Sequence, residues 1–141
     1  MLNSDYYLKK IRNFYDITSL IKILYGKQEI SKSLFLKQII DDIKTKGVKD
    51  EQIIYFDFEL KDDFNFNNAK KLYTYIKELA HCDKIYYVFL NEIQKINRFE
   101  ETINSLRVLD NFSIFITIST SKRIFLELST ELSGRYVSFK I

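Results

Sequence analysis

Residues 26–33 read Gly-Lys-Gln-Glu-Ile-Ser-Lys-Ser and hold the most specific chemistry in the sequence. A phosphate-binding loop has a glycine, four residues, a second glycine, a lysine and a serine or threonine, between a strand and a helix. Gly26, Lys32 and Ser33 keep this spacing, and Ser31 replaces the second glycine. Lys32 would then contact nucleotide phosphates and the Ser33 hydroxyl would bind Mg²⁺. Taken alone, the segment also fits an ordinary connection between a strand and a helix.

A second polar group follows the apolar run at 85–90, where Asn91 and Glu92 end the run. P-loop enzymes place two acids at such a strand end: the first holds Mg²⁺, usually through water, and the second polarises the attacking water. Glu92 stands at the general-base position. Asn91 stands at the metal position with a neutral oxygen, which predicts weaker Mg²⁺ binding because hard cations favour carboxylates. A polar strand end without a ligand is the alternative interpretation.

Short apolar runs alternate with amphipathic stretches along the whole chain, and these elements must position the two polar groups. Repeated βαβ units predict an α/β fold, a three-layer α/β/α sandwich with a five-stranded, mainly parallel sheet. We expect one domain over 1–141, with an N-terminal helix at about 5–17 and a core at about 20–141. The predicted strands are 20–25, 53–58, 85–90, 112–118 and 135–141, and the predicted helices are centred on 7–14, 36–43, 69–79, 99–106 and 124–132.

Four collinear segments resemble a known family, the prokaryotic AAA-superfamily P-loop ATPases that carry an Asp-Glu-Ile-Gln signature. The resemblance extends from residue 7 to residue 141, and its segments are 20–26, 53–59, 86–94 and 132–137. It implies ATP and Mg²⁺ as cofactors and the strand order 5-1-4-3-2. That order distinguishes it from an unrelated flavodoxin-like α/β domain, because an AAA core has its fourth strand between the first and third.

The resemblance also implies roles for individual residues. Lys32 and Ser33 are similar to the phosphate lysine and the Mg²⁺ hydroxyl, with Gly26 and Ser31 in the same loop. Glu92 is similar to the catalytic base. Arg135, in Ser-Gly-Arg at 133–135, is similar to an arginine that senses or contacts the γ-phosphate, which can be that of a neighbouring subunit. An exposed arginine at the start of a strand is the alternative for that residue.

Three departures from the family pattern fall on one predicted site. Ser31 replaces a loop glycine, Asn91 replaces the metal aspartate, and Thr120 replaces the polar sensor asparagine that positions the attacking water. The sequence therefore predicts an ATP-binding AAA-type domain with degraded Walker A, Walker B and sensor residues, in which hydrolysis is slow or absent. The alternative is a catalytically dead P-loop fold that acts as a protein-interaction module or is a decayed gene product. Since the family continues into a long C-terminal part, the resemblance implies a truncated member.

The composition limits which classes of partner the protein is expected to bind. The net charge is only +3 and the basic residues are scattered among acids, so no nucleic-acid surface is indicated. One cysteine, no signal-peptide core and no apolar run near the roughly 20 residues of a membrane helix favour a cytoplasmic protein. The single histidine, His81, excludes a histidine-rich zinc site. We expect nucleotide as a partner, together with either a protein partner or self-association.

Overall fold

The computed structural model describes residues 4–27, 31–60, 68–81, 83–119, 128 and 130–141. Strands and helices alternate through most of this length, as the apolar periodicity predicts. The elements are α1 (Ser4–Ile11), β1 (Ile21–Gly26), α2 (Lys32–Thr45), β2 (Ile53–Asp57), α3 (Ala69–Leu79), β3 (Tyr86–Asn91), α4 (Phe99–Arg107), β4 (Phe112–Ser119) and β5 (Tyr136–Lys140), with short 3-10 helices at Arg12–Phe14, Asp50–Gln52 and Ile93–Lys95.

The five strands form one parallel sheet in the order β2-β3-β4-β1-β5. Read from the other edge, this is the predicted order 5-1-4-3-2, so the prediction is confirmed. Strand β4 lies between β1 and β3, pairing Ile23 with Ile116 on one side and Val88 with Ile114 on the other. The flavodoxin-like alternative is therefore not supported.

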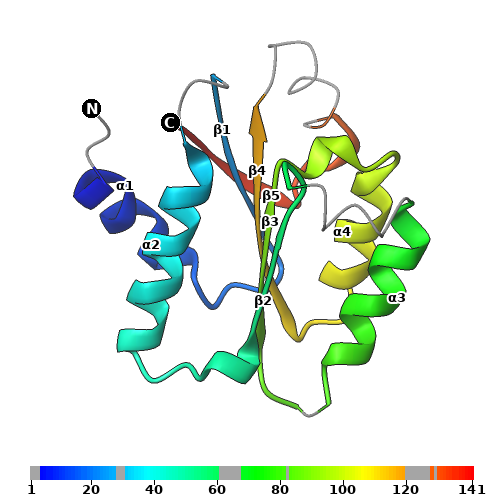
Figure 1. Cartoon of the computed structure of the whole chain (residues 1–141), viewed down its shortest axis with the longest axis horizontal. Coiled ribbons are helices and arrows are strands. Elements are labelled where there is room, and N and C mark those ends of the chain that lie inside the picture. The colour runs from blue at the N-terminus through cyan, green and yellow to red at the C-terminus, as the bar shows by residue number, and fades with distance from the viewer. Residues whose placement is uncertain (1–3, 28–30, 61–67, 82, 120–127, 129) are drawn as a thin grey trace.

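Helices cover both faces of the sheet and make the three layers visible in Figure 1, with α1 and α2 on one face and α3 and α4 on the other. Each face has its own buried cluster. On the α2 face, Phe35, Leu36 and Ile39 pack with Phe89 and Phe115, whose rings stack with centroids 4.7 Å apart. On the other face, residues of α3 and α4 pack against the alternate side chains of the same strands, such as Val88 and Ile114.

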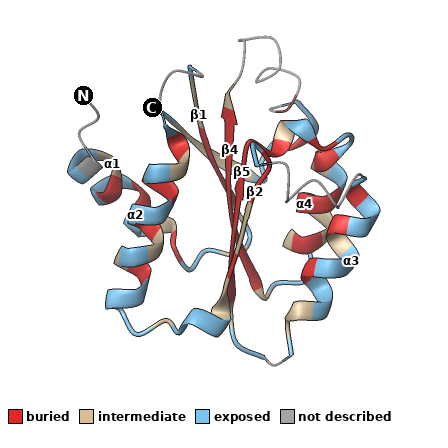
Figure 2. Cartoon of the chain, viewed as in Figure 1, coloured by how far each residue is buried: buried red, intermediate tan, exposed pale blue. Residues whose placement is uncertain are grey.

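Strand β3 is buried at every residue, and β4 is buried at all but its last. Figure 2 shows these central strands in the colour of buried residues while the outer helix faces are exposed. A strand of a parallel sheet that is covered on both faces must be apolar throughout, which explains the uninterrupted run at 85–90. The same burial makes any polar residue on these strands costly unless it is hydrogen-bonded.

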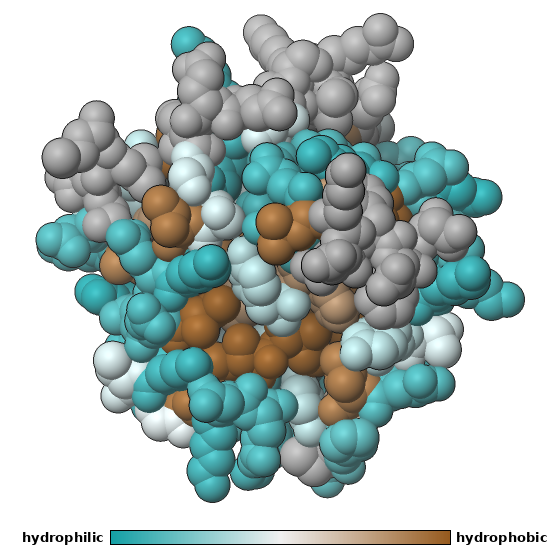
Figure 3. All heavy atoms as spheres, viewed as in Figure 1, coloured by the Kyte–Doolittle hydropathy of each residue, from teal (hydrophilic) through white to brown (hydrophobic). Residues whose placement is uncertain are grey.

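Strand β2 lies at one edge of the sheet and is less completely covered. Ile53, Tyr55 and Phe56 are half-buried. Figure 3 shows apolar side chains in the middle of this face of the molecule, where β2 runs in Figure 1, with hydrophilic side chains around them. The carboxyl end of the strand differs, because Asp57 is buried.

The boundaries of two predicted helices can be compared with the structure. The predicted helix at 7–14 divides into α1 and a 3-10 turn. Gly47 follows the end of α2 with a φ of 96°, the left-handed conformation expected of a glycine after a helix. The predicted helix at 124–132 lies mostly outside the described residues. Within the described part of the chain, no helix is long and apolar enough to cross a membrane.

Candidate functional site

The predicted site residues lie at the carboxyl edge of the sheet, where parallel strands end together. Gly26 ends β1, Ser119 ends β4 and Asn91 ends β3. Helix α2 begins at Lys32, close to the end of β1, and runs from there along one face of the sheet toward the amino edge. The structure thus brings together the phosphate-loop segment and the polar group after the third strand.

Lys32 is buried, with 2% of its surface exposed, and its ammonium group points to the end of β4. Its Nζ donates to Ser119 Oγ at 2.7 Å and to the carbonyl oxygen of Lys27 at 2.8 Å. Burial lowers the pKa of Lys32, while the nearby charges of Glu92 and Glu59 oppose that shift. The lysine therefore stands at the amino end of a helix, hydrogen-bonded within the site and close to acids.

The Glu92 carboxylate receives hydrogen bonds from two residues. Ser119 donates from Oγ to Oε2 at 2.5 Å and from its backbone N–H to Oε1 at 2.9 Å, and Gln94 donates from Nε2 to Oε1 at 2.7 Å. Burial acts to raise the pKa of Glu92, but these hydrogen bonds and the charge of Lys32 outweigh it, so that the pKa is lowered. Ser119 links the positive and negative groups of the site, because it accepts from Lys32 and donates to Glu92.

The backbone at Glu92 is in the left-handed region, with φ 56° and ψ 47°. This conformation costs a residue other than glycine roughly 1–2 kcal/mol, so the surrounding structure must hold it in place. The Glu92 N–H donates to Thr117 Oγ1 at 2.9 Å, and the carboxylate is held as described above. Such strained residues gather at functional sites, which is consistent with a chemical role for Glu92.

A second chain of hydrogen bonds crosses three strands. Thr117 Oγ1 donates to Asn91 Oδ1 at 2.5 Å, and Asn91 Nδ2 donates to Asp57 Oδ1 at 2.8 Å. Asp57 Oδ1 also accepts from the backbone N–H of Glu59 at 3.0 Å. The three side chains lie on the α2 face, because each is two residues beyond a residue packed in that core: Tyr55, Phe89 and Phe115.

The described part of the phosphate loop has an ordinary backbone. Ser31 has φ −75° and ψ 95°, a conformation that any residue adopts, so the missing glycine is not needed there for a positive φ. The Ser31 side chain makes no capping hydrogen bond to α2; its Oγ lies 3.4 Å from the hydroxyl of half-buried Ser33. At Gly26, an added Cβ would lie 2.5 Å from the carbonyl oxygen of Ile141, so close packing requires glycine.

One predicted residue, Arg135, is not brought to this cluster. Arg135 precedes β5, and its carbonyl oxygen accepts from the N–H of Ile21 at the start of β1. The arginine is exposed and lies at the opposite end of β1 from Gly26. Thr120, the predicted sensor residue, lies outside the described residues, as do residues 28–30 of the loop.

The structure adds functional candidates that the motif comparison did not name: Ser119, Thr117, Gln94 and Asp57. Three of them were detectable in principle, because Asp57, Thr117 and Ser119 are polar residues in the last positions of apolar strands, where ligands of α/β proteins bind. Their hydrogen-bond partners depend on strand register, which the motif alone does not give.

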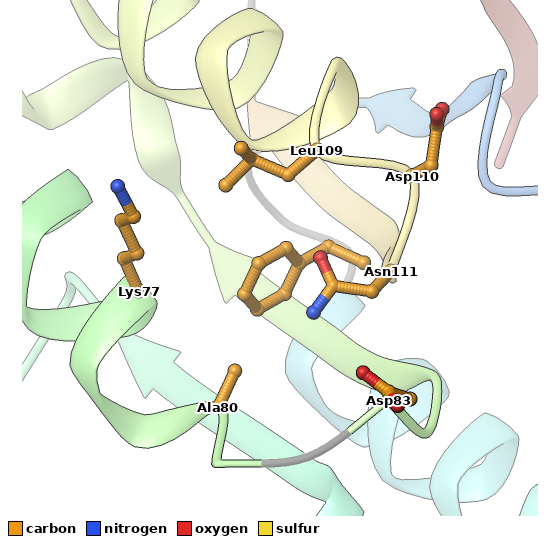
Figure 4. Close-up of a pocket in the computed structure, with 7 residues that line it drawn as sticks. Lys77, Ala80, Asp83, Leu109, Asp110 and Asn111 are labelled. Carbon is orange, nitrogen blue, oxygen red and sulfur yellow. The ribbon is translucent and has the colours of Figure 1, made fainter.

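A cavity of about 430 Å³ lies at the other end of β4, away from this cluster. It is lined by Lys77 at the end of α3, by Asp83 between α3 and β3, and by the segment that leads into β4, which includes Asn111; Figure 4 shows these side chains around it. Its polar groups do not converge on one point. The cavity lies at the amino edge of the sheet, so it is separate from the predicted site.

Comparison with known proteins is consistent with the fold. A family model described as an AAA domain matches residues 18–141. An uncharacterized protein from Haemophilus influenzae is 34% identical over 143 residues, and the uncharacterized protein MJ1544 from Methanocaldococcus jannaschii is 32% identical over 142 residues. Each match covers all of this chain, which spans 35% and 29% of the two relatives' lengths.

Solved structures give the same fold at low sequence identity. The match to PCH-2 of C. elegans has a TM-score of 0.67 at 15% identity, covering 97% of this chain and 41% of that one. A DNA polymerase III gamma subunit-related protein from Thermotoga maritima has a TM-score of 0.64 at 12% identity, covering 95% and 45%. These likenesses support the fold alone. Because the family model covers nearly the whole chain, we conclude that the protein belongs to the AAA domain family.

Proposed function

We propose that this AAA domain binds ATP at the carboxyl edge of its sheet and hydrolyses it slowly or not at all. One observation carries the proposal: Lys32 at the start of α2 and Glu92 at the tip of β3 meet at Ser119, at the end of β4. A buried cation at a helix N-terminus suits phosphate oxygens, and a carboxylate beside it suits a nucleophilic water.

The residues present fit ATP with Mg²⁺. The Ser31 side chain makes no capping hydrogen bond to the first turn of α2, where helix N–H groups suit phosphate oxygens, and Lys32 adds a charge there. Gln94 Oε1 is buried without a hydrogen-bond partner among the described residues, beside the Glu92 carboxylate. Ser33 and Asn91 are the residues that would hold the metal. Mg²⁺ bound with the nucleotide neutralises charge on the phosphate oxygens.

Slow hydrolysis follows from how Glu92 is held. Its carboxylate accepts hydrogen bonds from Ser119 and Gln94 and its pKa is lowered, so it is a weaker base than an ordinary glutamate. Asn91 has no charge of its own at the metal position. We therefore expect turnover below the roughly 1 s⁻¹ at the slow end of typical enzymes.

Lys32→Ala is expected to weaken nucleotide binding by about 10–100-fold, because a charge-assisted hydrogen bond to phosphate contributes roughly 1.5–3 kcal/mol. The measurement is a titration with a fluorescent ATP analogue in EDTA and again in Mg²⁺. Lys37→Ala is the matched control, since Lys37 is exposed on the same helix. Thermal unfolding without nucleotide shows whether both variants are folded.

The outcome that contradicts the proposal is an absence of saturable binding by the unaltered protein at millimolar nucleotide. A dead P-loop fold that serves as a protein-interaction module would then be the better interpretation, and the search for a ligand would turn to proteins.

Glu92→Gln is expected to leave ATP-analogue binding within about threefold of the unaltered protein and to lower any single-turnover phosphate release by about 10²–10³-fold, the usual effect of losing a general base. The substitution removes the charge and one of the two acceptor oxygens; the remaining amide oxygen can still accept from the Ser119 N–H and from Gln94, and the amide nitrogen would face the Ser119 hydroxyl. Equal phosphate release by the two proteins would show that Glu92 is not the base.

Arg135 supports a further part of the proposal, which concerns self-association. The arginine is exposed and lies at the far edge of the sheet from Lys32. From that position it serves a nucleotide site only on another copy of the chain, the role that the family resemblance implies. Light scattering with and without ATP tests this part of the proposal. We expect ATP to induce dimers of the unaltered protein and Arg135→Ala to abolish them.

A further inference from the structure

Asp57 stands beside the metal position, although neither the phosphate-loop pattern nor the polar pair of Asn91 and Glu92 includes it. It ends β2, directly in register with Asn91 at the end of β3, and 7% of its surface is exposed. Both side chains project to the α2 face, where Lys32 begins the helix. A buried carboxylate therefore lies one strand away from the residue that replaces the metal aspartate.

The hydrogen-bond network fixes which way the Asn91 amide faces. The Glu92 N–H donates to Thr117 Oγ1, so the Thr117 hydroxyl hydrogen is directed to Asn91 Oδ1. The Asn91 amide nitrogen consequently faces Asp57 and donates to its Oδ1 at 2.8 Å. An aspartate at position 91 could not make that donation, because an ionised carboxylate only accepts.

The pair thus carries one negative charge, as a single metal aspartate does, but the charge is on the neighbouring strand. We propose that Asp57 supplies the carboxylate of the Mg²⁺ site and acts through metal-bound water. Asn91 supplies a neutral oxygen at the metal position itself. This inference rests on the proposed ATP site. Under this proposal the site keeps a carboxylate for the metal, on β2 in place of β3, so Asn91 does not mark the loss of that charge.

One general property of Mg²⁺ and one feature of the structure support a water-mediated role. Mg²⁺ gives up its water reluctantly and commonly keeps several water ligands beside one or two carboxylates and the phosphates. Within the described residues, no three His, Cys, Asp or Glu side chains gather closely enough to hold a metal ion by themselves. The metal is therefore expected to bind with the nucleotide, and Asp57 to strengthen that joint binding from the second layer of ligands.

Asp57→Asn tests the proposal because it removes the charge and keeps an acceptor for the amide of Asn91. The affinity for a fluorescent ATP analogue is measured in EDTA and in Mg²⁺, and the ratio of the two affinities is the Mg²⁺ enhancement. We expect the enhancement to fall about tenfold, in line with outer-shell substitutions at metal sites, with affinity in EDTA unchanged within about twofold. Asp50→Asn, at the exposed amino side of β2, is the control for loss of one charge.

A second readout does not depend on the fluorescent analogue. Electron paramagnetic resonance of Mn²⁺ measures free metal, first with protein alone and then with a non-hydrolysable ATP analogue added. We expect little Mn²⁺ binding without the analogue, tight binding with it, and about tenfold weaker binding in Asp57→Asn.

The double variant Asp57→Asn with Asn91→Asp separates a displaced carboxylate from a lost one, and it keeps the test decisive if the single variant unfolds. A displaced carboxylate predicts a Mg²⁺ enhancement within about threefold of the unaltered protein, because the charge only changes strands. A rise of about tenfold or more would overturn the proposal, as would an undiminished enhancement in a folded Asp57→Asn protein. If the unaltered protein bound no nucleotide in either EDTA or Mg²⁺, the ATP site itself would be refuted.

Discussion

Asn91→Asp is expected to lower the free energy of unfolding by about 3–5 kcal/mol near pH 8, the usual cost of an unpaired charge in the interior. Asn91 Nδ2 donates to Asp57 Oδ1 at 2.8 Å, and both side chains are buried. Aspartate would replace this donor by a second carboxylate at hydrogen-bond distance. Restoring the residue expected at the Walker B metal position therefore disrupts the network found here.

The loss should depend on pH. Two carboxylates that share a buried site raise the pKa of one of them, so the folded variant keeps a proton that the unfolded chain releases above about pH 4. Because the folded state then binds more protons, its stability falls as the pH rises. The deficit relative to the unaltered protein should consequently be larger at pH 8 than at pH 5.

Urea unfolding at the two pH values, followed by circular dichroism, measures this deficit. The control is the double variant with Asp57→Asn, which restores a donor opposite an acceptor and is expected to recover most of the stability. A single variant as stable as the unaltered protein at pH 8 would show that the contact between Asp57 and Asn91 is weak.

The free energy of unfolding is expected to rise by about 1–3 kcal/mol as the pH is raised from 7 to 9, because of the titration of Lys22. Lys22 is completely buried in β1, where its Nζ donates to the carbonyl oxygen of Ile17 at 2.6 Å and to Ser113 Oγ at 2.8 Å. Its Nζ also lies 5.0 Å from the centre of the Phe115 ring. Burial lowers the pKa of Lys22 to about 7, and the nearby Asp16 carboxylate opposes that shift.

The sign follows from the protons bound in each state. Between pH 7 and the ordinary lysine value of 10.5, the unfolded chain keeps the Lys22 proton and the folded chain releases it. Stability therefore rises with pH in this window, and the full cost of burying the charge is present below pH 7. Burial and hydrogen bonds to Asp42 and Asp16 raise the pKa values of Tyr15 and Tyr87 above the ordinary tyrosine value, so their opposing effect begins only near pH 10.

Chemical denaturation at half-unit steps from pH 6 to pH 9 measures this dependence. Lys22→Met is the matched control, because it keeps a long side chain in the buried position and removes the titrating group. The difference between the two proteins isolates Lys22 from all other titrating groups. Parallel stability curves would mean that the hydrogen bonds to Ile17 and Ser113 hold the pKa near its ordinary value.

The fold was predictable because its signals are local. Apolar runs such as 85–90 gave the buried strands, and the alternation with amphipathic stretches gave the parallel sheet. The strand order required the resemblance to the AAA family, since periodicity does not say which strands pair. Gly47 is a local signal of the same kind, because a glycine in the left-handed conformation commonly follows the last turn of a helix.

The site was predicted only in part, for a physical reason. Lys32 and Glu92 belong to local motifs, and the structure places both at the carboxyl edge. Ser119 and Asp57 were not predicted, because their roles depend on contacts between strands, such as the pairing of Asp57 with Asn91. A motif specifies residue types at fixed separations along the chain, whereas these partners are chosen by register.

The strand order has a consequence for how the chain acquires its site during synthesis. Strand β1 is made first but pairs only with β4 and β5; Lys22, for example, pairs with Phe115. A growing chain can pair β2 with β3 and then add β4. Strand β1 stays unpaired until its partners, which lie in the last third of the sequence, have been synthesised. Contacts of such long sequence separation form late and slowly. Lys32 is therefore translated early yet meets Ser119 among the last events of folding, which leaves the apolar β1 in need of protection in the nascent chain.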